Sequence, residues 1–164
     1  ISGLTCWLDC LLVIYSDFNY KEDTAMVDQN CAYCMEGELV AKFGIKICEL
    51  ETSKVYLFKE QSHPGRCIVA HKKHVGDMNE LTAEERAAYF EDVARVARAI
   101  MKAFNPDKVN YGAYGDTGHH LHFHLCPKYK DEYEWGGVFL MNPDKKYLTD
   151  AEYTEMIEKI KANL

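Results

Sequence analysis

The chain has no apolar run long enough to cross a membrane and no excess of positive charge. A membrane-spanning helix needs roughly 18 to 20 apolar residues, and no stretch of the 164 residues reaches that length. Nineteen lysines and arginines stand against twenty-six aspartates and glutamates, which gives a formal net charge of −7. These properties argue against a membrane protein and against nucleic acid as the main partner. We expect a small-molecule substrate.

The sequence also lacks a paired set of cysteines. Its seven cysteines are an odd number, and they are scattered except for Cys31 and Cys34. This is not the spacing of a disulfide framework, so we expect a reducing, cytoplasmic environment. The chain contains no internal repeat and no low-complexity tract, and its length fits one domain.

Residues 4–14 are apolar, but Asp9 interrupts them and no basic residue precedes them. A secretory signal has a basic start before its apolar region, so this segment is a poor match to one. Two interpretations remain open. Residues 1–25 are an N-terminal extension outside the native domain, with Met26 as the natural start, or they form a docking helix. We expect a single domain over residues 26–164.

Short strand patterns alternate with two helical patterns along the chain. Strands are predicted near residues 45–47, 55–58, 67–70, 109–114 and 119–126, the last ended by Pro127. Thr82 and Thr149 each open a Thr-x-x-Glu capping box and therefore predict two helix starts. This order predicts an α+β domain with an antiparallel sheet of about five strands, a long central helix and a C-terminal helix.

The apolar side of each helix is read from the spacing of its large side chains. On the central helix it is predicted to consist of Phe90, Val93, Ala94, Ala97, Met101 and Phe104. On the C-terminal helix it is predicted to consist of Tyr153, Met156, Ile157, Ile160 and Leu164. Both helices are expected to be packing elements and not sites.

Histidines are concentrated in one short segment, because four of the seven lie within residues 119–124. Side chains alternate between the two faces of a strand, so His120, His122 and His124 share one face. An ordinary solvent-facing strand would not explain why each of these positions carries the same uncommon residue. Alternate histidines can ligate a metal, and a neutral imidazole can be a nucleophile. The residues alone leave these two interpretations open.

The segment His120-Leu-His122-Phe-His124-Leu-Cys-Pro resembles the signature of the histidine triad (HIT) superfamily of nucleotide hydrolases and transferases. In that signature three histidines alternate with apolar residues. The resemblance extends over residues 31–129. It includes the Cys31-x-x-Cys34 motif, the His71-Lys-Lys-His74 segment and the helix that follows them.

The resemblance implies roles for individual residues. His122 corresponds to the nucleophile that attacks the α-phosphorus of a nucleotide and forms a covalent nucleotidyl-histidine. His124 corresponds to a phosphate-contacting residue, and it favours hydrolysis because the uridylyltransferase branch carries glutamine there. Thr117 and Asn110 correspond to phosphate-binding residues. Glu60 lies near the position of a ribose-binding acid, but a solvated surface glutamate is the preferred interpretation.

The resemblance also implies a structural zinc site. The Cys31-x-x-Cys34 motif alone equally fits free thiols or a redox pair. Several members of the superfamily combine it with the histidine after the lysine pair and with the first triad histidine, which here are His74 and His120. His71 is the alternative to His74. A closed Cys₂His₂ set leaves no open position for an activated water, so the expected Zn²⁺ is structural.

The leading interpretation is a nucleotidyl hydrolase that acts on dinucleoside polyphosphates or nucleoside phosphoramidates. A purine nucleotide is the expected substrate and a homodimer the expected assembly. The basic residues Lys72, Lys73, Lys128 and Lys130 would favour a polyphosphate, although solvation at the surface is the commoner role of lysine. Trp135 is expected to anchor the core or an interface. Two alternatives remain, namely a non-catalytic nucleotide-binding module and a metallohydrolase whose three triad histidines ligate a catalytic metal.

Overall fold

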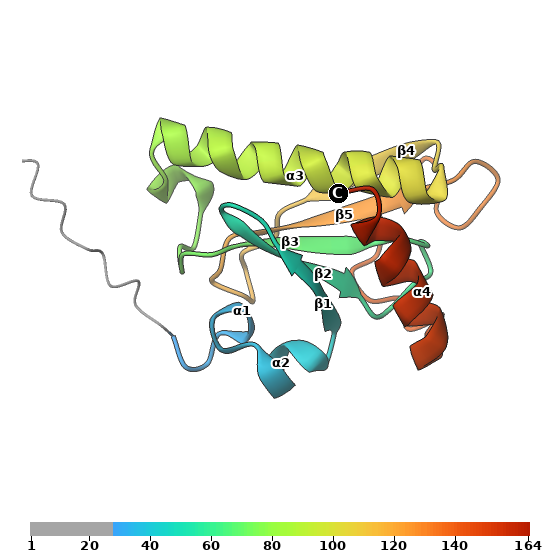
Figure 1. Cartoon of the computed structure of the whole chain (residues 1–164), viewed down its shortest axis with the longest axis horizontal. Coiled ribbons are helices and arrows are strands. Elements are labelled where there is room, and N and C mark those ends of the chain that lie inside the picture. Colours follow the sequence, from blue (N-terminus) through green and yellow to red (C-terminus); the bar gives the residue numbers. More distant parts are fainter. Residues whose placement is uncertain (1–27) are drawn as a thin grey trace, which may run out of the picture.

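A computed structural model describes residues 28–164, so the predictions for residues 1–25 lie outside the described residues. Figure 1 shows a sheet with the long helix α3 along one face and the short helices α1 and α2 on the other. In chain order the elements are α1 (Ala32–Met35), α2 (Gly37–Ala41), β1 (Gly44–Glu49), β2 (Ser53–Phe58), β3 (Cys67–His71), η1 (Met78–Glu80), α3 (Ala83–Phe104), β4 (Lys108–Gly112), β5 (His122–Lys128) and α4 (Asp150–Lys161).

The five strands form one sheet in the order β1-β2-β3-β5-β4. All neighbouring strands are antiparallel. Strand β5 is therefore internal, with Ala70 of β3 opposite His122 and Gly112 of β4 opposite His124. The predicted α+β fold with about five antiparallel strands, a long helix and a C-terminal helix is confirmed, and it fixes the histidine strand inside the sheet.

The main hydrophobic core lies between the sheet and the helices α3 and α4. Leu121, Phe123 and Leu125 enter this core from the histidine segment. They pack with residues of α3 such as Val96 and Ile100, both fully buried. Burial of each such side chain stabilises the fold by roughly 1.5–3 kcal/mol. This face of the sheet supplies stability to the domain.

The predicted apolar side of α3 was only partly right, because Val93 and Ala97 are buried as expected. Thr82 does cap the helix with the predicted box, accepting a hydrogen bond from the backbone amide of Glu85. However, the predicted core residues Phe90 and Met101 are 43% and 40% exposed. The buried side includes Tyr89 and Ile100 instead. The helix is therefore rotated about its axis relative to the expectation.

Two polar anchors account for this rotation. The hydroxyl of Tyr89 donates to the carbonyl of Val69 at 2.7 Å. The buried carboxylate of Asp92 accepts hydrogen bonds from the amide and hydroxyl of Thr52 and from the hydroxyl of Ser53. A buried carboxylate needs such donors, so the helix must turn Asp92 toward the β1–β2 hairpin. The spacing of apolar residues in the sequence does not predict these hydrogen bonds of Asp92.

Strand β5 starts later and runs further than predicted. It begins at His122, so that His120 precedes the strand, and it passes through Pro127, which pairs with Val109 of β4. Proline interrupts a strand because it has no N–H to donate. Strand β3 pairs with β5 only as far as Leu125, so one edge of β5 is already unpaired at Pro127. The prediction that Pro127 ends the strand was wrong.

The second face of the sheet has a smaller core near α1 and α2, which were not predicted. Tyr33, Tyr56, Phe58 and Ile68 are buried there. These helices bring the cysteine motif beside the histidine segment. Across residues 28–164, no helix combines the length and the apolar character that a membrane crossing requires.

Candidate active site and metal centre

A pocket of about 960 Å³ opens on the sheet face that carries the histidines. His120, His122 and His124 all line it. Strand alternation accounts for His122 and His124, whereas His120 reaches the pocket from the segment before β5. Aromatic and aliphatic side chains, the loop before β5 and the segment 138–141 form the rest of the wall. The pocket is thus apolar around a line of imidazoles, which is the usual character of a small-molecule site.

His122 is held as a neutral imidazole of one tautomer. Its side chain is buried, and its Nδ1 lies 2.7 Å from the carbonyl oxygen of His120. A carbonyl only accepts, so Nδ1 carries the hydrogen and Nε2 carries the lone pair. Burial lowers the pKa of His122 below its ordinary value, so this lone pair is available at neutral pH. The arrangement is that of a nitrogen nucleophile.

His124 has the opposite tautomer. Its Nδ1 lies 3.3 Å from Nη2 of Arg66. A guanidinium only donates, so Nδ1 of His124 accepts and Nε2 carries the hydrogen. Burial first, and then the Arg66 charge, lower the pKa of His124 to about 2. His124 therefore offers a neutral N–H donor, while its neighbour His122 offers a lone pair.

Arg66 was missed by the sequence analysis. It is fully buried, and its guanidinium lies over the rings of Phe58 and Phe139 at 4.3 and 4.8 Å from their centroids. Its Nη1 donates to the carbonyls of Leu140 and Met141 at 3.2 and 2.9 Å. Ring faces and carbonyls compensate a buried cation in place of a carboxylate. In the sequence, the only sign of a buried arginine is its position directly before the apolar strand β3.

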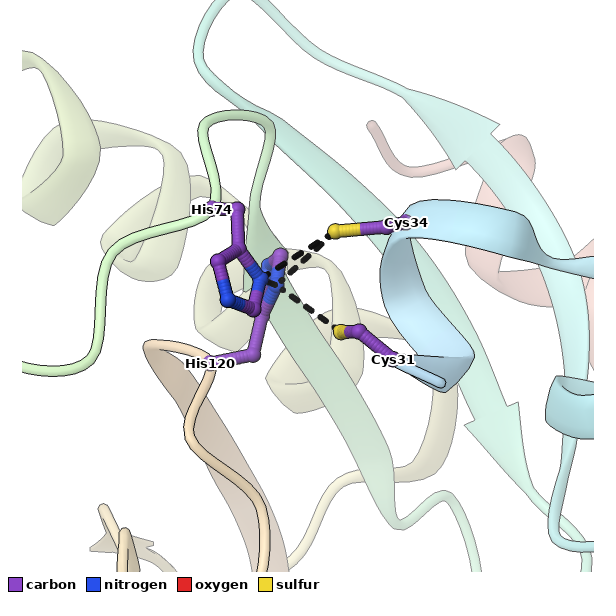
Figure 2. Close-up of side chains that lie close together, drawn as sticks. All are labelled: Cys31, Cys34, His74 and His120. Atoms are coloured by element: carbon purple, nitrogen blue, oxygen red, sulfur yellow. Dashed lines mark hydrogen bonds between the residues drawn. The ribbon is translucent and has the colours of Figure 1, made fainter. Parts of the chain in front are cut away.

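The predicted metal ligands Cys31, Cys34, His74 and His120 converge on one point (Figure 2). The cysteines come from α1 and its start, His74 from the loop after β3, and His120 from the segment before β5. Their four ligand atoms lie within 4.8 Å of one another. In the part of the chain that the structure describes, this is the Cys/His group able to hold a metal, and it does not include His122 or His124.

The four ligand atoms are close enough to hold one metal ion between them. The Nδ1 atom of His120 lies 3.3 Å from Sγ of Cys31 and 3.3 Å from Nδ1 of His74. Sγ of Cys34 lies 3.2 Å from Nδ1 of His74. These separations are slightly shorter than the roughly 3.4–3.8 Å between the ligand atoms of a tetrahedral zinc, so a bound ion would move the four side chains slightly apart. The other ring nitrogen of His120 donates to the carbonyl of His71 at 2.7 Å, so the Nδ1 lone pair faces the cluster.

His71 is engaged elsewhere. Its Nδ1 accepts a hydrogen bond from the amide of Lys73 at 3.1 Å. Its ring packs edge-on against Tyr89. The structure therefore groups His74, and not His71, with the two cysteines.

Tyr33 lies between the Cys/His group and His122, and it too was missed. It lies between the two cysteines in the sequence, and its buried ring packs against the rings of His120 and His122 at 5.1 and 5.0 Å. Burial raises the pKa of its hydroxyl. An aromatic residue inside the cysteine motif was the only available signal.

Of the other predicted binding residues, only Thr117 lies in the wall of the pocket. Asn110 lines a separate hollow. Glu60 is neither a pocket residue nor a surface residue, so both interpretations of it were wrong. It is 1% exposed and accepts hydrogen bonds from the backbone amides of Lys145 and Lys146 at 3.3 and 3.1 Å. Glu60 therefore anchors the C-terminal loop.

The four lysines proposed to attract polyphosphate do not form a cluster. Lys72, Lys73 and Lys130 each pair with a carboxylate, and Lys128 is buried. None of them is part of the pocket wall. Strands β3 and β5 are antiparallel, so the residues after β3 and the last residue of β5 lie at opposite ends of the sheet.

Trp135 does not anchor the core, because it is 42% exposed. It lines the same separate hollow as Asn110. Its expected role at an interface stays a prediction.

Comparisons with known proteins agree with this architecture. Adenosine 5'-monophosphoramidase hnt1 of Schizosaccharomyces pombe is 28% identical over 141 residues, which cover 80% of this chain and 99% of that protein. Bis(5'-adenosyl)-triphosphatase of Dictyostelium discoideum is 28% identical over 98 residues, which cover 57% and 65%. The crystal structure of a histidine triad protein from Sinorhizobium meliloti 1021 superposes with a TM-score of 0.72 at 23% identity, covering 78% of this chain and 95% of that one.

The HIT domain model matches residues 44–131, more than half of the chain, including β1 to β5 and the triad. This match agrees with the alternating histidines and with the fold that carries them. The chain belongs to the HIT domain family.

Proposed function

We propose that this protein is a nucleotidyl hydrolase that cleaves at the α-phosphate through a covalent intermediate on His122. The observation that carries the proposal is the opposite tautomers of His122 and His124. One ring presents a lone pair to the pocket wall, and the next presents an N–H donor. A nucleophile beside a donor for developing negative charge is what phosphoryl transfer requires.

In the first step, Nε2 of His122 attacks the α-phosphorus. The N–P bond forms while the bond from phosphorus to the leaving group breaks, and the leaving group takes the electron pair. An amine leaving group also takes up a proton from solvent. Because burial and the Arg66 charge lower the pKa of His124, its ring stays neutral. Its Nε2–H can then donate a hydrogen bond to a phosphate oxygen, since Nδ1 accepts from Arg66. In the second step, water attacks phosphorus and gives up a proton to solvent. The N–P bond breaks, and the nucleoside monophosphate is released with His122 neutral again.

Purine nucleotides are the proposed substrates. Both relatives described above are named for adenosine compounds, one a phosphoramidate and one a triphosphate. Tyr33, Phe43, Phe58 and Ile68 line the pocket, and such side chains suit the faces of a nucleobase. Thr117 lies in the loop before β5 and also lines the pocket. Its hydroxyl is the proposed phosphate contact. Nucleoside phosphoramidates and dinucleoside polyphosphates are the two substrate classes to compare.

A structural zinc is proposed at Cys31, Cys34, His74 and His120. With all four positions taken by protein ligands, the metal would stabilise the fold and would not activate water. The ligand loop also holds Tyr33 against His122. The role of these residues in the reaction is thus to position the nucleophile.

A homodimer in the cytoplasm is the proposed state of the protein. Strand β4 lies at the edge of the sheet, and Tyr111 on this strand is 53% exposed. An edge strand offers unpaired backbone groups to another chain. Light scattering on the purified protein gives the assembly directly.

The test is turnover of adenosine 5'-phosphoramidate and of diadenosine tetraphosphate by the wild type and by His122→Ala. We expect hydrolysis of at least one substrate by the wild type and loss in the variant, while binding of AMP persists. Binding without turnover in the wild type would instead identify a non-catalytic nucleotide-binding module. Wild-type turnover by His122→Ala would contradict the mechanism.

A further inference from the structure

A second hollow, of about 310 Å³, lies at the far end of β5 from the nucleophile. It is lined by Lys108, Asn110, Lys128, Trp135, Gly136 and Gly137. Lys128 follows His122 and His124 on the same face of β5, because alternate residues share a face. Six residues of strand separate it from His122, roughly 20 Å. One phosphate therefore cannot occupy both places.

Lys128 carries an unusual buried charge. It is only 2% exposed. Within residues 28–164, its ammonium group makes no hydrogen bond and no ion pair. An ammonium has three donors, and a buried charge without a partner is strongly unfavourable. Lys128 lines the hollow, so an anion bound there could accept hydrogen bonds from its ammonium group.

Lys108 increases this positive charge. It stands directly opposite Lys128 in the pairing of β4 with β5, where like charges destabilise a sheet. No acidic residue lines the hollow. The nearby carboxylate of Glu134 is already bound to His63 at 2.9 Å and to the amide of Leu140. The described residues therefore leave the two cations uncompensated.

The remaining lining groups are mainly donors. The indole of Trp135 can only donate, and the amide of Asn110 offers two N–H groups. Gly136 has a φ of +82°, and a Cβ built there would meet nothing within 4 Å. Its backbone is therefore accessible, as in loops that bind anions. Two lysines with such donors have the chemistry of an oxyanion site.

We propose that this hollow is a binding site for a small phosphate-type anion, separate from the nucleotide pocket. The anion, either free phosphate or pyrophosphate or the phosphate group of a nucleotide, accepts hydrogen bonds from Lys128 and Lys108. It supplies the charge that the buried ammonium lacks. The site does not depend on the reaction at His122.

The test uses the fluorescence of Trp135 in the full chain, with the only other tryptophan changed by Trp7→Phe. Inorganic pyrophosphate and ADP are titrated in parallel, so that free phosphate and nucleotide phosphate are distinguished. We expect a saturable change with at least one of them and a higher Tm in its presence. Lys128→Met should weaken this binding about tenfold or more, because a charged hydrogen bond is lost.

Two further variants keep the test decisive. Lys130→Met removes an exposed lysine on the neighbouring segment, 66% exposed and 4.0 Å from Asp107, and should leave binding unchanged. Lys108→Met removes the exposed cation of the site and should weaken binding even if Lys128→Met does not fold. Equal affinities in Lys108→Met, Lys128→Met and Lys130→Met, or no saturable signal up to about 10 mM anion, would overturn the proposal.

Discussion

The two faces of β5 are both buried, but they are buried for different reasons. Phe123 and Leu125 are 9% and 0% exposed and pack against α3. On the opposite face, His122 and His124 are 7% and 3% exposed, yet each has its Nδ1 committed to one specific partner. Burial on the first face provides stability, and burial on the second fixes a tautomer. A burial profile alone does not distinguish the two.

The largest expected effect separates chemistry from folding on the histidine face. His122→Ala should lower turnover by at least about 10³-fold, as removal of a covalent nucleophile does. Its free energy of unfolding should fall by about 1–2 kcal/mol, because the side chain loses one hydrogen bond and its ring contact with Tyr33 but borders the pocket. Steady-state kinetics and urea unfolding measure the two. A large loss of stability with a modest loss of turnover would show that His122 serves folding more than chemistry, which would contradict the proposed difference between the two faces.

The opposite result is expected on the core face. Leu125→Ala should reduce the free energy of unfolding by about 2–5 kcal/mol, since the side chain is fully buried in the main core. Turnover per folded molecule should stay near that of the wild type at a temperature well below the melting point. Urea unfolding measures the free energy, and active-site titration gives the concentration of folded enzyme for the turnover number. If kcat fell as far as in His122→Ala, the separation of the two faces would be wrong.

A smaller effect concerns Arg66, which positions His124. Arg66→Met keeps the length of the side chain but removes the donor to Nδ1 of His124. Turnover should fall about 10- to 100-fold, the range found when groups that orient active-site histidines are removed. The pKa of His124 should rise, because a neighbouring cation has been removed.

Nitrogen NMR of the histidine rings gives a readout that a merely structural role would not move. It should show Nε2–H at His124 in the wild type and a mixture of tautomers in Arg66→Met. Arg95→Met is the matched control, because Arg95 binds the carbonyl of Leu164 away from the pocket. If His124 kept the same tautomer in Arg66→Met, Arg66 would not be the group that sets it.

The smallest effect is the contribution of one histidine, His122, to the pH dependence of stability. Burial lowers the pKa of His63, His122 and His124 in the folded protein. Below about pH 6.5 the unfolded chain binds protons that the folded chain does not, so stability should fall as the pH falls. Each histidine contributes up to about 1.4 kcal/mol per pH unit. Urea unfolding between pH 7.5 and 5 should show a smaller slope in His122→Ala, and equal slopes would contradict the assignment.

Local patterns in the sequence predicted the parts of the site that depend on one segment. The side-chain alternation of a strand placed His122 and His124 on one face, and the capping boxes placed the starts of α3 and α4. The resemblance to a family brought together Cys31, Cys34, His74 and His120, a grouping that the structure reproduces. No pattern in those separate segments would have joined them without the resemblance.

Contacts between distant segments explain what the sequence did not predict. Asp92 rotates α3 through hydrogen bonds to Thr52 and Ser53, about forty positions earlier in the chain. Arg66 depends on the carbonyls of Leu140 and Met141, which lie more than seventy positions later. Such contacts arise only after the chain has folded. Hydrophobic periodicity does not encode them.

The most direct test of the central claim is to trap the reaction intermediate. Wild-type protein is mixed with the substrate that it hydrolyses, quenched within one turnover and digested for mass spectrometry, with nitrogen and phosphorus NMR to locate the bond. The account predicts a nucleoside monophosphate linked to Nε2 of His122, because Nδ1 is bound to the carbonyl of His120. A nucleotide on another residue, or on Nδ1 of His122, would contradict it.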